Sequence, residues 1–346
     1  MILQQLENDV TKILGKDTRI ADMFDMVSGT STGSIISLGL TVSDGANPPR
    51  PMYPASELVK LYKEKGKEIF SKVTHWSPVK VTNLLHKAPN NEEVPAVNIL
   101  DSAYFRAHTR IEPADGDDGL FGPSYNPNGL EKLLKEKFAD KLLKDTLKNV
   151  LVPSYNITDT KDVYFTNYSD VTNSYKMRDV IRASTAAPTY FEAEKIDGKY
   201  YIDGGVFMNN PAYKAYLEVK NKFSHLSEFS SSDNQVKKQE ILVCSLGTGY
   251  FQDELNYLED SGSIRWASPL ISLMMNMSSN LVDEYLENFQ QRDEITYYRL
   301  QVNLIKNIPL DDTSDQALND LEGYAKAIIN KQVYKNLVEN IVNHLK

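Results

Sequence analysis

A serine between two glycines lies where one apolar run of the chain gives way to another. The first run covers 23–27 and the second 35–40, a pattern typical of a strand, a sharp turn and a helix. Such a turn raises the serine oxygen above the end of a sheet, and the first helical amides favour negative charge beside it. The alternative is an ordinary turn in which the serine caps the helix. The motif consists of Gly29, Thr30, Ser31, Thr32 and Gly33.

A second polar signal ends an apolar run far downstream. Asp203, Gly204 and Gly205 directly follow residues 200–202. Asp-Gly is the commonest turn dipeptide, so a simple turn is one interpretation. Beside a nucleophilic serine, however, the carboxylate offers a base that can accept the hydroxyl proton. The two motifs together therefore predict a serine nucleophile that is activated by an aspartate.

Four further segments occur between and after these motifs. In this order the set resembles the patatin-like phospholipase family, from about residue 3 to residue 249. The segments are 149–153 (Asn-Val-Leu-Val-Pro), 183–191 (Ala-Ser-Thr-Ala-Ala-Pro-Thr-Tyr-Phe), 209–212 (Asn-Asn-Pro-Ala) and 241–249 (Ile-Leu-Val-Cys-Ser-Leu-Gly-Thr-Gly).

The resemblance implies an activity and roles for the motif residues. It implies a lipid acyl hydrolase of the phospholipase A type that cleaves fatty-acyl esters of phospholipids or related lipids through an acyl-enzyme. Ser31 would be the nucleophile and Asp203 the general base, in a Ser-Asp dyad without histidine. The elbow residues Gly29, Thr30, Thr32 and Gly33 would shape the turn and the oxyanion site. Gly204 and Gly205 would form the turn that carries the base.

The five histidines allow a different arrangement. A Ser-His-Asp esterase acting on small esters usually has its histidine after the acid, and only His225 and His344 follow Asp203. Neither lies in a turn marked by glycine or proline, so we interpret all five as structural or exposed. The others are His75, His86 and His108.

The N-terminus differs from the family pattern. The family carries a Gly-Gly-Gly-x-Arg/Lys-Gly loop on its first strand, and the amides of that loop form the oxyanion hole. Residues 1–6 resemble the helix that follows the loop, and apolar residues continue at helical spacing to Leu14. We therefore expect the loop and first strand to be missing, which leaves the Thr32 amide as one oxyanion donor and one sheet edge unpaired. Losing one donor costs about 100- to 1000-fold in turnover.

Three explanations for that N-terminus stay open. Either the start lies upstream, or the chain is a fragment or engineered piece, or it is a degenerate relative. The last of these predicts a catalytically impaired protein that binds lipid or a partner protein. The retained Ser31 and Asp203 favour a family with real catalytic ancestry.

Composition restricts the other function classes. The chain has 346 residues, 41% of them hydrophobic, enough for one large domain over 1–346, with a core at about 1–250 and a mainly helical part at about 255–346. Its 38 basic and 47 acidic residues give a net charge of −9, which argues against nucleic-acid binding.

No metal or cofactor pattern occurs, and the one cysteine, Cys244, is expected in a buried strand. We expect no cofactor and no metal.

The expected partner is a lipid or membrane-surface substrate. No apolar run approaches 18 residues, so we expect no transmembrane anchor. No signal peptide is visible, which favours a protein that is cytoplasmic or peripheral to a membrane, while secretion as an effector stays open.

Alternating helical and strand patterns predict a three-layer α/β/α fold with a largely parallel central sheet. In such a fold Ser31 and Asp203 meet at the carboxyl ends of strands. The residues after Trp266 are expected to be mostly helical, and their first apolar cluster favours a core helix over an acyl-chain groove or a membrane-touching face. The expected elements are helices at 57–72 and 130–147, strands at 150–157 and 163–167, an irregular segment at 86–128 and a polar loop at 227–239.

Overall fold

The computed structural model describes residues 1–71, 123–223, 241–252, 255–259 and 263–346. Its helices are α1 (Ile2–Leu14), α2 (Ile20–Met23), α3 (Thr32–Thr41), α4 (Ala55–Ile69), α6 (Asn128–Phe138), α7 (Met177–Ser184), α8 (Gly205–Met208), α9 (Ala212–Glu218), α10 (Ser263–Gln291), α11 (Asp315–Ile329) and α12 (Gln332–Leu345). Its strands are β1 (Met26–Ser28), β2 (Asn149–Asn156), β3 (Lys161–Thr166), β4 (Glu194–Ile196), β5 (Lys199–Asp203), β6 (Ile241–Leu246) and β7 (Ile295–Leu300). Short turns of 3₁₀-helix occur at Leu143–Asp145 and Leu255–Leu258, and a π-helical turn at Val219–Phe223.

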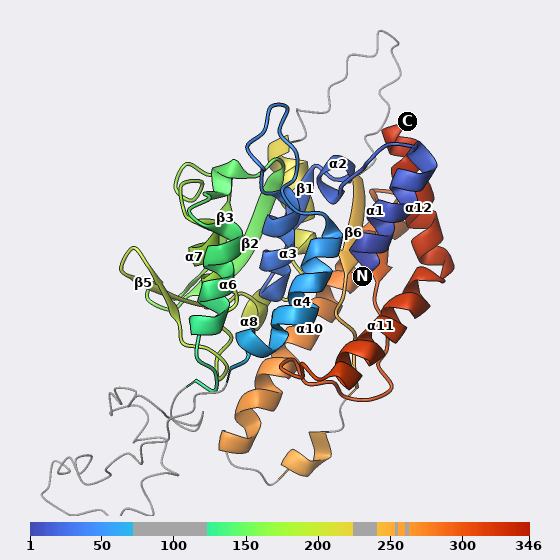
Figure 1. Ribbon diagram of the computed structural model, residues 1–346. Coiled ribbons are helices and arrows are strands. Elements are labelled where there is room, and N and C mark those ends of the chain that lie inside the picture. The colour runs from blue at the N-terminus through green and yellow to red at the C-terminus, as the bar shows by residue number, and fades with distance from the viewer. Residues whose placement is uncertain (72–122, 224–240, 253–254, 260–262) are drawn as a thin grey trace, which may run out of the picture.

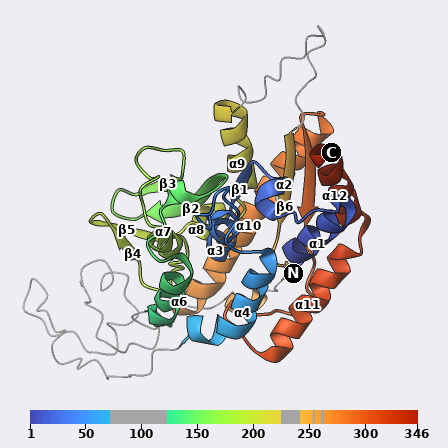
Figure 2. The ribbon, with the colours of Figure 1, turned by 45° about the horizontal axis from the view of Figure 1, so that its top comes forward.

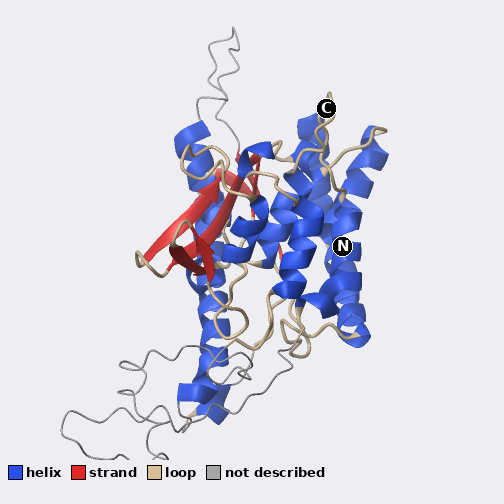
Figure 3. Ribbon diagram, turned by 60° about the vertical axis from the view of Figure 1, so that its left-hand side comes forward, coloured by secondary structure: helices blue, strands red, loops and turns tan. Residues whose placement is uncertain are grey.

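The expected α/β architecture is confirmed. The helices α3, α6 and α7 cover one face of the sheet around β2, and α8, α9 and α10 lie on the other side (Figure 1, Figure 3). Parallel pairings join β1 to β2 and β6 to β7, so the expected parallel arrangement holds for these strands. The strands β3 and β5 pair with β2 in the antiparallel sense, and β4 pairs likewise with β5.

Strand β2 organises the sheet because both of its edges are used. Its residues 151–156 pair with β3 along one edge. The other edge is shared, since β1 pairs with 149–151 and β5 pairs with 154–156. Within the described residues β1 pairs with β2 alone, so it is an edge strand. The carboxyl ends of β1 and β5 consequently point toward each other along this shared edge of β2, where β1 ends opposite Leu151 and β5 ends opposite Ser154.

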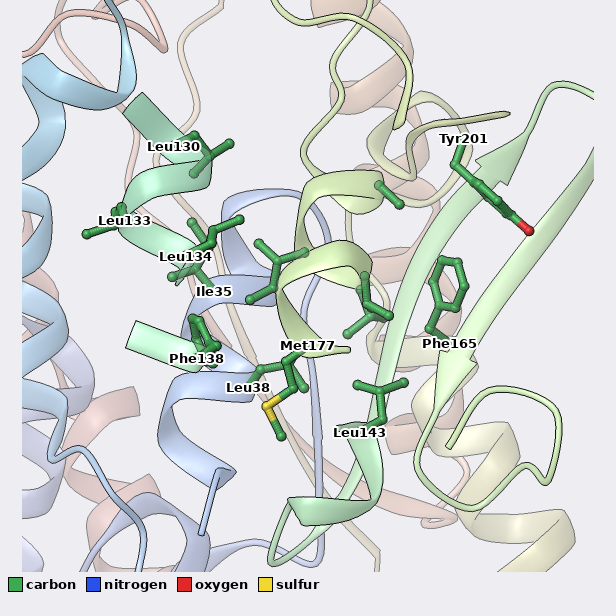
Figure 4. Close-up of a cluster of buried hydrophobic side chains, with 14 of the residues drawn as sticks. Ile35, Leu38, Leu130, Leu133, Leu134, Phe138, Leu143, Phe165, Met177 and Tyr201 are labelled. Carbon is green, nitrogen blue, oxygen red and sulfur yellow. The ribbon is translucent and has the colours of Figure 1, made fainter. Parts of the chain in front are cut away.

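The main core fills the space between β2 and the helices α3, α6 and α7 (Figure 4). Helix α6 places Leu130, Leu133, Leu134 and Phe138 on one face, the spacing of an amphipathic helix. Each of these side chains is at most 4% exposed. Buried residues of α7, the helix that follows β3 in the chain, pack beside them and hold α7 against the sheet.

The elements at the two ends of the chain share a second core. Leu6 and Val10 of α1 pack with Leu337 and Ile341 of α12, and Figure 2 shows these two helices side by side. Within the same region the buried carboxylate of Glu7 accepts the Ile20 and Ala55 amides, at 3.1 and 2.8 Å. One side chain thereby accepts a free amide from the first turn of both α2 and α4.

Two expected helices have different bounds in the structure. The helix predicted at 57–72 is α4, which begins two residues earlier and ends at Ile69. The prediction of one helix over 130–147 is wrong beyond Phe138, because Ala139 adopts a positive φ of 45° and its amide bonds the Lys135 carbonyl. The chain then forms the 3₁₀ turn at Leu143–Asp145 before entering β2. The strands predicted at 150–157 and 163–167 are β2 and β3.

Some expectations concern residues outside the described part of the chain. The polar loop at 227–239 and most of the irregular segment at 86–128 are among them. The expected helical C-terminal part contains α10, α11 and α12, and also β7, which pairs with β6 in a two-stranded sheet. None of the described helices combines the length and the apolar character that crossing a bilayer requires.

Candidate active site

The strand-turn-helix at Ser31 forms where the sequence pattern predicts it. Strand β1 ends at Ser28, and α3 begins at Thr32, so Ser31 lies at the apex between them. Ser31 has φ 55° and ψ −128°, a conformation that side-chain-bearing residues rarely adopt. Such strain persists only where surrounding contacts maintain it.

The two glycines of the turn have different roles. A Cβ on Gly29 would lie 2.0 Å from the carbonyl oxygen of Gly33, so only glycine fits at the first position. A Cβ on Gly33 would meet no atom within 4 Å. Gly29 is therefore required by a close approach of the backbone, whereas Gly33 faces open space.

Hydrogen bonds fix the turn to three other segments. The Gly29 amide donates to the Leu151 carbonyl of β2 at 3.2 Å. The Thr30 hydroxyl donates to the Met208 carbonyl at 2.8 Å. The Ser31 amide donates to the hydroxyl oxygen of Ser184 at 3.0 Å.

Ser184 is a residue whose role the sequence analysis did not identify. Its side chain is fully buried at the end of α7, and its hydroxyl donates to the Pro153 carbonyl of β2 at 2.7 Å. The hydroxyl therefore connects the strained Ser31 backbone to the central strand. The segment 183–191 is part of the family resemblance, but nothing in the sequence indicates that its serine contacts the turn.

Asp203 lies at the end of β5 with no exposed surface. The Ser31 hydroxyl donates to Asp203 Oδ2 at 2.5 Å, and the Gly205 amide donates to Oδ1 at 2.7 Å. The structure thus brings the predicted pair together. The opposed ends of β1 and β5 on the same edge of β2 explain how residues so distant in sequence come into contact.

Burial dominates the electrostatics of this carboxyl. It raises the pKa of Asp203 from 3.8 to about 7, although the bonds from Ser31 and Gly205 favour the ionised form. A base with a pKa near neutral pH is well matched to proton transfer. The arrangement can therefore activate the serine hydroxyl for attack on an electrophilic carbon.

The turn that carries Asp203 is closely packed on both sides. A Cβ on Gly204 would lie 2.4 Å from the Pro153 carbonyl oxygen, so this residue approaches β2 closely. A Cβ on Gly205 would lie 2.8 Å from Cε of Met275, which comes from α10. Gly204 is therefore required by a backbone contact, whereas a Cβ at Gly205 would have to displace the end of the Met275 side chain.

The start of α3 offers one unused donor beside the serine. The amides of Gly33 and Ser34 already bond the carbonyls of Thr30 and Ser31, each at 2.8 Å. Among the described residues the Thr32 amide has no acceptor. It is thus available for a developing negative charge next to Ser31, as the sequence analysis expects.

A buried polar network supports the segment after Asp203. The Asn210 amide nitrogen donates to Asp283 Oδ1 at 2.9 Å, and Arg299 Nε lies 2.9 Å from the other carboxylate oxygen. The Ser245 hydroxyl connects Asn210 with Arg299, at 3.1 and 2.9 Å. These partners come from β6, α10 and β7. Ser245 lies in the segment 241–249 of the family resemblance, whereas Asp283 and Arg299 are single polar residues in an ordinary helix and strand that no local motif marks.

The structure describes one of the two histidines considered as alternatives. His344 lies exposed near the end of α12, and His225 is outside the described residues. The direct bond between Ser31 and Asp203 occupies the place where an imidazole would stand in a Ser-His-Asp arrangement. In the described part of the chain, no group of three or more His, Cys, Asp or Glu side chains could hold a metal ion.

The α/β fold and a serine-aspartate pair at a strand-helix turn define a class of hydrolase-like proteins. The family model described as patatin-like phospholipase matches residues 2–216. Because that match covers more than half of the chain, the protein belongs to the patatin-like phospholipase family.

Individual relatives agree with this assignment. Patatin-like protein 2 of Arabidopsis thaliana is 30% identical over 326 residues, which cover 87% of this chain and 71% of that protein. Patatin-like protein 2 of Oryza sativa subsp. indica is 28% identical, covering 96% of this chain and 80% of its own. Patatin-T5 of Solanum tuberosum is 26% identical, over 99% and 81%.

One solved structure aligns with most of this chain. VipD from Legionella pneumophila aligns with 15% identity and a TM-score of 0.28 over 95% of this chain and 64% of that chain.

Proposed function

We propose that this protein is a lipid acyl hydrolase that cleaves fatty-acyl esters of phospholipids or related lipids. The observation that supports it most directly is the 2.5 Å hydrogen bond from the Ser31 hydroxyl to the buried Asp203 carboxylate. Membership of the patatin-like phospholipase family supports a lipid substrate class.

In the proposed first step Asp203 accepts the hydroxyl proton of Ser31, and Ser31 Oγ bonds to the ester carbonyl carbon. The tetrahedral oxyanion receives a hydrogen bond from the Thr32 amide. When the C–O bond to the leaving group breaks, that alkoxide takes the proton back, and an acyl-serine ester remains.

The second step regenerates the protein. A water molecule gives its proton to Asp203 and attacks the acyl carbon. Collapse of this second tetrahedral intermediate breaks the bond to Ser31 Oγ, which recovers its proton as the fatty acid leaves. The strained backbone of Ser31 keeps its oxygen in one position through both steps.

Labelling with a fluorophosphonate probe tests this assignment. The probe should modify the native chain covalently, and both Ser31→Ala and Asp203→Ala should abolish the modification. Hydrolysis of a phosphatidylcholine substrate should be lost in the same two variants. A folded native chain that neither reacts with the probe nor hydrolyses the lipid would contradict the proposal.

A further inference from the structure

Helix α10 presents two different faces along its length. One face is buried, with Met275 against Gly205 and with Leu286 in the core next to β7. The opposite face exposes large apolar side chains. The expectation of a core helix is therefore right for the inner face and wrong for the outer one. The outer face comprises Leu270, Leu273, Met274, Met277, Leu281 and Tyr285, each 40–60% exposed.

The spacing of these six residues places them in one continuous strip. They follow each other at intervals of one, three or four positions, which keeps them on one side of a helix. The strip extends from Leu270 to Tyr285 over four turns, or about 22 Å. Figures 1 and 3 show that the first part of α10 projects from the rest of the described helices and strands, with the short 3₁₀ turn at Leu255–Leu258 beside it.

Charge distribution restricts what can cover this outer face. No charged residue occurs from 266 to 282, and within the strip's span only the last turn carries charge. There Asp283 contacts Asn210 and Arg299 on the inner side, and Glu284 is exposed. The whole chain carries a net charge of −9, so an anionic surface would repel it. An electrically neutral, apolar partner fits both observations, because its binding would depend on the apolar area that is removed from water.

The area of the outer face argues against a second copy of this chain. Six side chains exposed to this extent present on the order of 600 Å², less than the roughly 800 Å² that each partner buries in an interface of standard size. A lipid surface has no such requirement, since even a short apolar strip can enter the boundary between head groups and acyl chains.

The outer face also lies close to the candidate active site. Met275, on the inner side of the same helix, contacts the turn that carries Asp203. The Asn209 amide, a few residues after that turn, lies 3.4 Å from the Ser278 hydroxyl of α10. Because a helix is about 10–12 Å across, a surface against the outer face would lie about one helix diameter from this turn.

We propose that the outer face of α10 docks this protein on the surface of neutral or zwitterionic lipid, next to the Ser31–Asp203 pair. The proposal deepens the lipid acyl hydrolase function and rests on it for the identity of the docked surface. Binding to lipid and hydrolysis of lipid are nevertheless separate measurements.

Co-sedimentation with phosphatidylcholine vesicles provides the test. The double variant Met277→Glu with Leu281→Glu adds two charges to the strip at exposed positions, so the fold should be retained. The matched control, Val171→Glu with Ile305→Glu, adds the same charge at side chains that are 73% and 89% exposed elsewhere. The native chain and the control should have the same partition coefficient for the vesicles, at 0.1 and at 0.5 M NaCl. The partition coefficient of the α10 variant should be at least tenfold lower.

Two further readouts separate docking from catalysis. Hydrolysis of the water-soluble ester p-nitrophenyl butyrate should be equal in the native chain and the α10 variant. Ser31→Ala should still sediment with vesicles. If the native chain docks but hydrolyses nothing, the proposed function fails and the docking surface stands.

Equal partitioning of the α10 variant and its control would overturn the docking proposal, and so would a native chain that does not bind vesicles. Light scattering tests whether a second copy of the chain covers the outer face instead. A native dimer that becomes a monomer in the α10 variant, without vesicle binding by either, would assign the outer face to a second copy of the chain.

Discussion

The hydroxyl of Ser31 and the carboxylate of Asp203 lie 2.5 Å apart although 172 positions separate them in the sequence. Their contact follows from the arrangement of β1 and β5, which occupy the same edge of β2 and point toward each other. Ser31 follows the end of β1 and Asp203 ends β5, so the two side chains meet directly and no imidazole is needed between them.

The pH dependence of hydrolysis should reflect the buried carboxyl. Asp203 can accept a proton only when it is ionised, and burial raises its pKa to about 7. We therefore expect kcat/KM for a soluble ester to rise with pH up to about 7 and to level off above it. The measurement is a pH profile from 5 to 9.

Histidine also titrates in this range, so the profile needs a control. His225→Ala and His344→Ala should retain the same inflection if Asp203 is the base. Loss of the inflection in either variant would support the Ser-His-Asp alternative, and a native profile that is flat from pH 5 to 9 would contradict the raised pKa.

Replacing Asp203 by asparagine should stabilise the fold while it removes activity. Because the pKa of Asp203 is raised on folding, the folded state holds a proton that the unfolded state has lost between pH 3.8 and about 7. The carboxyl therefore lowers the free energy of unfolding as pH rises through this window, by at most about 1.4 kcal/mol per pH unit. The difference in Tm between Asp203→Asn and the native chain should become more positive from pH 4 to 7. A difference that is constant with pH would disprove this account.

Ser184 should act as a positioning residue for the turn at Ser31. Ser184→Ala removes the acceptor of the Ser31 amide, which leaves a donor without its partner at the strained position. We expect kcat to fall at least tenfold with KM nearly unchanged, because the substrate contacts stay in place. Steady-state kinetics on a soluble ester measures both values.

Ser184→Thr is the matched variant for this experiment because it keeps the hydroxyl. It should recover most of the lost turnover. A Tm measurement on both variants separates a misplaced serine from a poorly folded chain. Equal kcat in Ser184→Ala and the native chain would exclude a positioning role.

The two glycines of the elbow should respond differently to alanine. Gly29→Ala forces a Cβ to within 2.0 Å of a backbone oxygen, so we expect a loss of at least 3 kcal/mol in the free energy of unfolding. Gly33→Ala meets open space in the first turn of α3 and should be neutral or stabilising by up to about 1 kcal/mol. Urea unfolding of both variants provides the comparison. Equal losses would show that the packing of the turn has been misjudged.

The sequence predicted the elements of the site better than their arrangement. A glycine-bounded serine and an Asp-Gly-Gly turn have local signatures, so both were recognised and are found in contact. Their meeting was expected from parallel strands, whereas β5 runs antiparallel to β2. Pairing direction depends on contacts between distant segments, which no short motif records.

The contacts that support the site were missed for a related reason. Ser184 and Asp283 are ordinary polar residues in helices, and their importance comes only from what folding places beside them. The outer face of α10 is different, because its periodicity is visible in the sequence. Periodicity alone does not reveal which side of a helix the rest of the chain leaves uncovered.

The network of Asn210, Asp283 and Arg299 bears on the modularity of this protein. The region that matches the family model ends at residue 216, yet two of these three partners lie beyond it. Met275, which packs on Gly205, also lies beyond it. A segment transplanted at the family boundary would lose the side chains that brace its own acidic turn. The smallest transferable unit of this architecture therefore extends at least to the end of β7, and insertions between β6 and α10 are tolerable only if they return the chain to the same contacts.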